Sequence, residues 1–228
     1  MRKNRNRPES DEPLSEGRVE YLEAARQRVR NRRIRRTAVL LVLLTAVVLF
    51  ATGIAGSSVA ALKDLTDTAR IALLPGSGWP QQTGVAELEQ MAPLTGSFVE
   101  LGDEGCVVWS RTGKKLNSIQ SGYARPAIAA GKTRFVLYNR SGNELRVESR
   151  TQNLYTKTMD STISLCAVAD AGQVAVVTDS TDSVAKLTVY NSSMQQQLVW
   201  NLTSEQGTPL RMAFAPDSRR LAVAAVSA

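Results

Sequence analysis

Hydrophobic and polar positions divide the chain into regions with different patterns. Residues 38–62 are almost entirely aliphatic or small, whereas the residues before them are dominated by charged side chains. Beyond residue 93, short β-branched runs alternate with Gly, Asn, Asp and Ser. About 20 apolar residues are enough to cross a membrane as a helix, and short alternating runs predict strands and turns. The pattern therefore predicts one transmembrane helix followed by an all-β domain.

Basic residues precede the apolar run. The arginines closest to it are Arg26, Arg28, Arg30, Arg32, Arg33, Arg35 and Arg36. Because a dense Lys/Arg cluster keeps its end of a span in the cytoplasm, we expect a single-pass protein of the cell membrane with its N-terminus inside and its C-terminal domain outside. The same arginines are expected to contact anionic lipid. A cleaved signal peptide is the alternative, although its charged region is normally shorter than 37 residues.

The remaining segments follow from composition. Residues 1–14 are polar and interrupted by proline, which predicts a disordered cytoplasmic tail. Residues 15–37, with Ser15 as a possible cap, predict a basic juxtamembrane helix. In residues 63–93 a helical turn is possible near Asp64–Leu74, and several prolines and glycines then favour a stalk or lead-in. Residues 94–228 form the predicted β domain.

The predicted strands repeat. Val108, Val147 and Val189 occupy matching positions at intervals of 39 and 42 residues, and strand–turn–strand patterns start at Pro126, Cys166 and near Ala213 in phase with them. A period near 40 residues with about four short strands is typical of a β-propeller blade, whereas a β-sandwich needs no phased repeats. We expect about three blades, the last stopping after two strands. Because propellers close with four to eight blades, the sequence suggests a truncated fragment, or an open array that another chain completes.

The last repeat adds a motif. Its sequence, Phe-Ala-Pro-Asp-Ser-Arg-Arg-Leu-Ala-Val from Phe214, resembles the F-S-P-D-G-x-x-L-A-V repeat in the propellers of prolyl-oligopeptidase-type peptidases and periplasmic translocation proteins, with Ser218 in place of glycine. Pro216 fixes φ and Asp217 can bond its own backbone, so both residues predict a structural turn. Trp109 and Tyr190, at matching or adjacent repeat positions, predict aromatic packing between blades.

The order of weaker motifs carries a second resemblance. It consists of Gly78-Trp-Pro, Val108-Trp-Ser-Arg-Thr-Gly-Lys-Lys-Leu, Tyr123-Ala-Arg-Pro, Leu187-Thr-Val-Tyr-Asn and the repeat at Phe214. Over about residues 30–228 this order is similar to an uncharacterised family, a domain of unknown function, of bacterial single-pass membrane proteins with a WD/PQQ-like propeller. The resemblance implies an extracytoplasmic propeller on an anchor. It supplies no catalytic residues.

Charge argues against nucleic acid as a partner. The net charge of +7 lies mostly in residues 1–37, which hold 12 Lys/Arg and 6 Asp/Glu, so the rest of the chain carries only +1. An exported domain that is nearly neutral lacks the electrostatic attraction on which nucleic-acid binding depends. Membrane lipid, in contrast, suits the basic N-terminal segment.

Candidate chemistry is sparse. The sequence has no histidine and no G-x-S-x-G motif, which excludes histidine-based triads and His-ligated metals. Cys106 and Cys166 are predicted to be buried small hydrophobic residues, with a disulfide as the less favoured alternative. A calcium site is conceivable at either of two acidic turns, but solvated turn carboxylates are commoner. These turns hold Asp103 with Glu104 and Asp179 with Asp182. We therefore predict no cofactor and no catalytic or metal-binding residue.

The sequence indicates the function of the protein only in outline. The leading hypothesis is a non-catalytic binding or scaffold module that recognises a protein, peptide or cell-envelope ligand on the propeller. One alternative is a transmembrane signalling or regulatory protein that senses the exterior and contacts a cytoplasmic partner. The other is the propeller domain of an enzyme whose catalytic part is missing from this chain.

Overall fold

The computed structural model describes residues 37, 40, 41, 44, 55–73, 75–140 and 142–227. The chain separates into two units, residues 1–55 and 56–228, and all described strands lie in the second. The predicted tail, the juxtamembrane helix, the seven arginines and most of the predicted span fall outside the described residues. Within the described ranges, no helix has both the length and the apolarity that crossing a membrane requires.

One long helix, α2 (Ala55–Leu73), precedes the sheets. It includes the last residues of the predicted span and continues through most of the stretch where we expected a helical turn. Ala and Leu are common in it and favour a helix, and Pro75 follows closely after its end.

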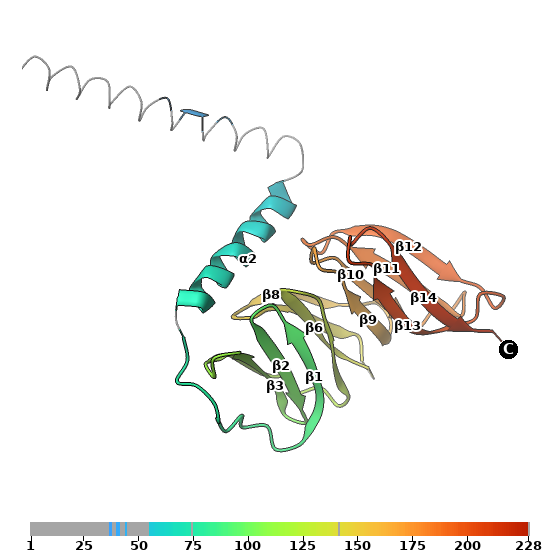
Figure 1. The fold of residues 1–228 in the computed structure, drawn as a ribbon. Helices are drawn as coiled ribbons and strands as arrows, with labels where there is room; N and C mark the ends of the chain where they lie inside the picture. The colour runs from blue at the N-terminus through green and yellow to red at the C-terminus, as the bar shows by residue number, and fades with distance from the viewer. Residues whose placement is uncertain are drawn as a thin grey trace, which may run out of the picture. The chain divides into compact units, whose positions relative to one another are not determined.

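Fourteen described strands form four antiparallel sheets, each with its strands in chain order (Figure 1). Sheet 1 contains β1 (Leu88–Leu94), β2 (Ser97–Gly102), β3 (Gly105–Ser110) and β4 (Lys115–Gln120). Sheet 2 contains β5 (Pro126–Ala130), β6 (Arg134–Asn139), β7 (Glu144–Ser149) and β8 (Asn153–Thr158). Sheet 3 contains β9 (Ile163–Val168), β10 (Val174–Thr178), β11 (Ala185–Tyr190) and β12 (Gln196–Leu202). Sheet 4 contains β13 (Thr208–Phe214) and β14 (Leu221–Val226).

The all-β domain and its four-stranded sheets are confirmed. Val108, Val147 and Val189 lie on the third strands, opposite Val99, Val136 and Ala175 of the second strands, as the repeat spacing predicts. The blade count differs, since three complete sheets precede the two-stranded one. The sequence repeats missed the first hairpin because Leu88–Leu94 contains Glu89, Gln90 and Pro93, which hide its strand pattern.

Apolar side chains pack between neighbouring sheets. Val99, Leu101, Val108, Phe135 and Leu137 form the core between sheets 1 and 2. Two further clusters fill the spaces between sheets 2 and 3 and between sheets 3 and 4. No sheet therefore buries its faces alone, which is the way propeller blades are stabilised.

The two ends of the strands form two distinct faces. Turns between the first and second and between the third and fourth strands form the turn face, at residues 95–96, 111–114, 131–133, 150–152, 169–173, 191–195 and 215–220. All other connections form the loop face, at residues 103–104, 121–125, 140, 142–143, 159–162, 179–184 and 203–207. Three contacts align the turn face across all four sheets: Thr95 N–H to Lys132 O (2.7 Å), Lys132 to Asp170 (2.8 Å) and Ala171 N–H to Ser218 Oγ (3.1 Å).

The segment before β1 covers the outward side of sheet 1. The ring centroid of Trp79 lies 5.7 Å from those of Phe98 and Trp109, with the ring planes tilted, and its Nε1 donates a hydrogen bond to Arg111 O. Trp109 is 5% exposed as a result. The predicted packing role of Trp109 is thus fulfilled by the lead-in segment and not by another sheet.

Candidate binding cavity and helix clamp

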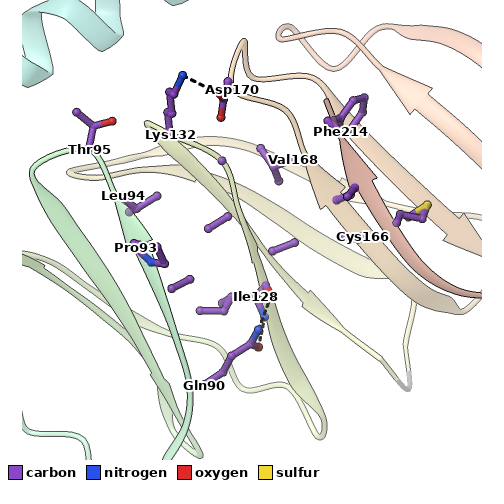
Figure 2. A pocket seen from close by; sticks show the side chains of 17 residues that line it. Gln90, Pro93, Leu94, Thr95, Ile128, Lys132, Cys166, Val168, Asp170 and Phe214 are labelled. Atoms are coloured by element: carbon purple, nitrogen blue, oxygen red, sulfur yellow. Dashed lines mark hydrogen bonds and ion pairs between the residues drawn. The ribbon is translucent and has the colours of Figure 1, made fainter. Parts of the chain in front are cut away.

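A cavity of about 720 Å³ lies between the first strands of all four sheets (Figure 2). The four strands approach one another in sequence, β1 with β5, β5 with β9 and β9 with β13. Its lining is rich in small side chains, namely Ala92, Ala129, Ala130, Ala167 and Ala213. Small residues on converging strands leave space that larger ones would fill, so the composition of these strands creates the cavity.

Gln90 supplies a polar group on the wall of the cavity. Its side-chain amide donates to Ile128 O over 2.9 Å and accepts from Ile128 N–H over 3.0 Å. This pair of bonds is the one that a neighbouring peptide group would make in a β-ladder. The amide therefore satisfies one position on the edge of β5 that faces the cavity.

The cavity reaches the turn face at Thr95, Lys132 and Asp170. Lys132 Nζ and Asp170 Oδ2 form an ion pair there, with side chains 63% and 30% exposed. An exposed pair of this kind contributes little to stability. It does place both signs of charge beside an otherwise mainly apolar space, which suits binding of a ligand with apolar and polar parts.

The cavity holds no activated nucleophile. Cys166 lines it, but burial raises the pKa of this thiol far above its ordinary value, which disfavours the reactive thiolate. Burial likewise raises the pKa of Cys106 to about 12. Both cysteines are free, so the alternative prediction of a disulfide is wrong, because their strands belong to different sheets.

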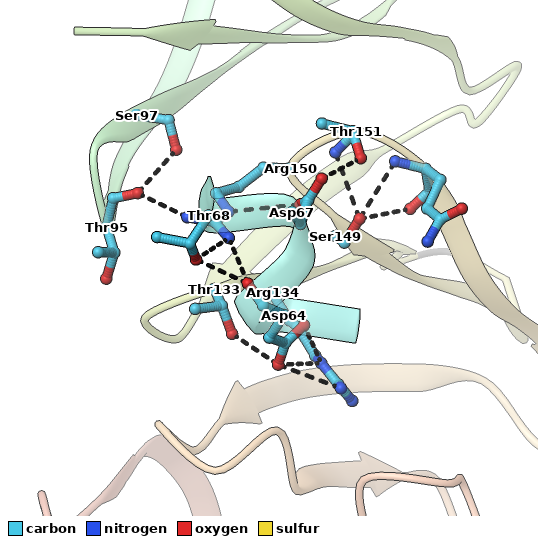
Figure 3. A network of polar contacts seen from close by, with 11 residues as sticks. Asp64, Asp67, Thr68, Thr95, Ser97, Thr133, Arg134, Ser149, Arg150 and Thr151 are labelled. Atoms are coloured by element: carbon cyan, nitrogen blue, oxygen red, sulfur yellow. Dashed lines mark hydrogen bonds and ion pairs between the residues drawn. The ribbon is translucent and has the colours of Figure 1, made fainter. Parts of the chain in front are cut away.

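A second polar site attaches α2 to the turn face (Figure 3). Asp64 of α2 pairs with Arg134, whose Nη2 lies 3.2 Å from Oδ2, and Thr133 Oγ1 donates to the same carboxylate over 3.1 Å. Arg134 is 3% exposed and also donates to Ser192 O over 3.0 Å. One arginine thus connects the helix with sheets 2 and 3.

Arg150 completes this attachment, which we call the helix clamp, formed by Asp64, Asp67, Thr68, Arg134 and Arg150. Arg150 is 1% exposed and lies 3.5 Å from Asp67 Oδ2. Its guanidinium donates to Asp64 O (3.1 Å), Thr68 Oγ1 (2.7 Å) and Thr95 O (3.0 Å). Because a buried charge is costly unless it is paired and hydrogen-bonded, these partners make α2 part of the folded domain.

Pro216 and Asp217, predicted from the repeat motif, lie in the turn between β13 and β14. Asp217 Oδ1 accepts a hydrogen bond from Arg219 N–H over 3.0 Å, and Oδ2 lies 3.2 Å from Arg220 Nη2. Ser218 has a φ of 57°. These contacts close the turn, and Asp217 does not line the cavity.

The acidic turns considered for calcium lie on the loop face. Asp103 Oδ1 accepts from the adjacent N–H of Glu104 over 2.9 Å. In the described part of the chain, no three acidic, histidine or cysteine side chains gather as a metal site would require.

Sequence reasoning missed the helix clamp. Arg134 and Arg150 are separated by 15 other residues and show no spacing that links them to Asp64. The available signal was local: Arg134 begins the strand Arg-Phe-Val-Leu-Tyr, and a charge at the end of a buried strand calls for a partner. The sequence could not show that this partner is a helix 70 residues away.

The fold and the cavity define an all-β protein built of four-stranded antiparallel sheets that resemble those of propeller proteins. The chain belongs to the family of unknown function DUF5711, which matches residues 79–228. No curated protein matches the sequence significantly. The predicted resemblance to a domain of unknown function is thereby confirmed, while the membrane part of that prediction lies before the matched residues.

Solved structures show distant similarity. Kluyveromyces lactis Hsv2 is 14% identical, with a TM-score of 0.47 over 60% of this chain and 45% of that one. The calcium-binding protein regucalcin from Agrobacterium tumefaciens is 14% identical, with a TM-score of 0.39 over 61% of this chain and 54% of that one. The chain therefore spans about half the length of these structures.

Proposed function

We propose that this protein is a membrane-anchored, extracytoplasmic, propeller-type binding or scaffold module without catalytic activity of its own. The cavity between the first strands carries the binding part of the proposal, because four sheets converge on one space that is mainly apolar with a few polar groups. The apolar run at residues 38–62 and its basic flank support the anchor. The ligand class is a protein, a peptide or a component of the cell envelope.

Site-specific photo-crosslinking tests the binding role. A benzophenone amino acid replaces Ala213, which lines the cavity, or Thr181, which is exposed on the loop face. In intact cells we expect a discrete adduct from position 213 that mass spectrometry identifies, and none from position 181. Identical adducts from both positions, or none from either, would count against a ligand in the cavity.

Protease treatment tests the topology. External protease on intact cells should remove the β domain and spare a tag at the N-terminus. Replacing the seven arginines before residue 38 with glutamate should disturb this orientation, since the basic cluster sets it. Digestion of the N-terminal tag in unmodified protein would contradict the proposed topology.

The helix clamp favours a second candidate, transmembrane signalling. Because α2 overlaps the predicted span in sequence and is attached to sheets 1, 2 and 3, movement in the sheets would reach the anchor. Reproducible crosslinking of the N-terminal segment to one cytoplasmic protein would support this role. Full function after replacement of residues 1–37 by an unrelated basic segment would exclude it.

A further inference from the structure

Charge is divided unequally between the turn face and the loop face. The turn face holds six basic residues, Arg111, Lys114, Lys132, Arg150, Arg219 and Arg220, and two acidic ones, Asp170 and Asp217. The loop face holds six acidic residues, Asp103, Glu104, Asp160, Asp179, Asp182 and Glu205, and two basic ones, Arg125 and Arg140. The nearly neutral β domain is therefore positive at one face and negative at the other.

Most basic side chains of the turn face can be reached by a partner. Arg111, Lys132, Arg219 and Arg220 are exposed, and Lys114 is half-buried. Lys132 pairs with Asp170 and Arg220 with Asp217, but exposed ion pairs of this kind are weak, so these side chains can exchange partners. Arg150 is occupied by the helix clamp. The turn face thus offers four exposed cations distributed over sheets 1, 2 and 4, a spread that suits an extended anionic surface better than a single small ion.

The helix clamp attaches the turn face to a residue that lies close in sequence to the predicted span. The predicted span ends at Leu62, and Asp64, two residues further, is bound to Arg134 and Thr133 of the turn face. Two helical residues advance by about 3 Å. Figure 3 shows Asp64 beside Thr133 and Arg134. A turn face attached so close to the end of the predicted span is held within reach of the membrane surface.

We propose that the turn face binds the surface of the membrane through anionic lipid headgroups, with Arg111, Lys132 and Arg219 as principal contacts. This inference rests on the membrane anchor of the proposed function and adds an orientation and a partner. The loop face, with its acidic residues, points away from the lipid. The cavity reaches the turn face at Thr95, Lys132 and Asp170, so this end of the cavity lies beside the lipid.

The full chain, reconstituted in vesicles, provides the test. Single cysteines replace Ala171 on the turn face and Thr181 on the loop face, both exposed, in a background with Cys106→Ala and Cys166→Ala. Vesicles contain phosphatidylcholine alone or with phosphatidylglycerol. The readouts are the rate of labelling by a bulky impermeant maleimide and the quenching of an attached dye by spin-labelled lipid.

With phosphatidylglycerol present, we expect the cysteine at position 171 to be labelled several-fold more slowly than that at 181 and to be quenched more strongly. The double variant Arg111→Glu, Arg219→Glu should abolish the difference, as should high salt, which screens exposed charges. The matched variant Arg125→Glu, Arg140→Glu on the loop face should leave it intact. Circular dichroism of each variant checks that the fold is retained.

Two results would overturn the inference. One is equal labelling of both cysteines in phosphatidylglycerol vesicles. The other is a difference that persists in phosphatidylcholine alone or after Arg111→Glu, Arg219→Glu, because lipid charge would then play no part. Release of the chain from the vesicles by alkaline carbonate would show that it does not span the membrane. That result would contradict the anchor of the proposed function and is distinct from the two results above.

Discussion

Ser218 Oγ accepts a hydrogen bond from the backbone N–H of Ala171 over 3.1 Å, joining sheets 3 and 4 at the turn face. The residue has a φ of 57°, a left-handed conformation that costs a non-glycine residue about 1 kcal/mol or more. In the repeat that this segment resembles, glycine occupies the position. Serine here accepts backbone strain and gains a contact between two sheets.

Substitutions at Ser218 should separate these two effects. Ser218→Gly relieves the strain and loses the hydrogen bond, so we expect the free energy of unfolding to change by less than about 0.5 kcal/mol. Ser218→Ala keeps the strain and loses the bond, which should cost about 1–2 kcal/mol. Denaturant unfolding of the full chain in detergent measures both values. Equal stability of the two variants would contradict the interpretation.

Removal of the Arg150 side chain should release α2. The guanidinium is buried and bonds three oxygen atoms besides its ion pair with Asp67, so Arg150→Ala should lower the free energy of unfolding by about 3 kcal/mol. Amide hydrogen exchange in residues 64–73 should accelerate. Arg111→Ala, an exposed control, should stay within about 0.5 kcal/mol of the unmodified protein. Unchanged exchange in α2 after loss of Arg150 would show that the clamp does not hold the helix.

The side-chain amide of Gln90 should stabilise the fold by its hydrogen bonds to the edge of β5. Gln90→Ala leaves both polar groups of the Ile128 backbone without this partner, at a cost of about 1–2 kcal/mol. Gln90→Glu should cost more at neutral pH, because a carboxylate oxygen would face Ile128 O. Lowering the pH should then recover part of the loss as the carboxyl group becomes a donor. Gln120→Ala, exposed on β4, serves as the control in the same unfolding assay.

Glu100 should reduce stability as the pH rises. Its side chain is buried on β2 and Oε2 has no hydrogen-bond partner; burial raises its pKa, against a smaller opposite effect of a hydrogen bond with Thr83. The folded state then holds the proton more tightly than the unfolded state does. Protonated Glu100 therefore contributes its full stability below the ordinary carboxyl pKa of about 4.3. This contribution is lost as the pH rises through the raised pKa of the folded state. Glu100→Gln should therefore raise the unfolding temperature at pH 7 and flatten its decline from acidic to neutral pH. A lower unfolding temperature at pH 7 would contradict this account.

The cysteines should resist alkylation in the folded protein. Burial raises the pKa of both thiols, to about 12 for Cys106. At pH 8 we expect negligible reaction with iodoacetamide in native conditions and complete reaction in urea, where the thiol pKa returns to about 8.5. Mass spectrometry counts the modified thiols. Rapid labelling of native protein would contradict the raised pKa of these thiols.

Periodicity was sufficient to predict the repeated sheets because each contains two strands with strong local patterns. The second strands of sheets 2 and 3, Arg134–Asn139 and Val174–Thr178, are mostly apolar. The third strands contribute Val108, Val147 and Val189, whose spacing reveals the period. The first hairpin of sheet 1 lacked this signal. Its charged and proline-containing strand is held by pairing with β2, a contact that local propensity does not encode.

The candidate sites were less predictable because each depends on contacts between elements that lie far apart in the sequence. The cavity requires four strands from Gln90 to Phe214 to converge. The helix clamp requires residues 64 and 150 to touch across most of the domain. Single residues such as Pro216 and Asp217 could be assigned to a turn because their conformational preferences act within a few neighbouring residues.

The separated charges of the turn and loop faces also affect how the protein behaves in isolation. Residues 38–228 carry a net charge of only +1, which by itself suggests weak retention on any ion exchanger. The loop face has an excess of four negative charges, and the turn face keeps an excess of three positive charges once Asp64 and Asp67 are paired with Arg134 and Arg150. A resin interacts with one face at a time. The β domain is therefore expected to bind both cation-exchange and anion-exchange media at low ionic strength. For the same reason its molecules should stack with opposite faces together in dilute buffer and separate when salt is added.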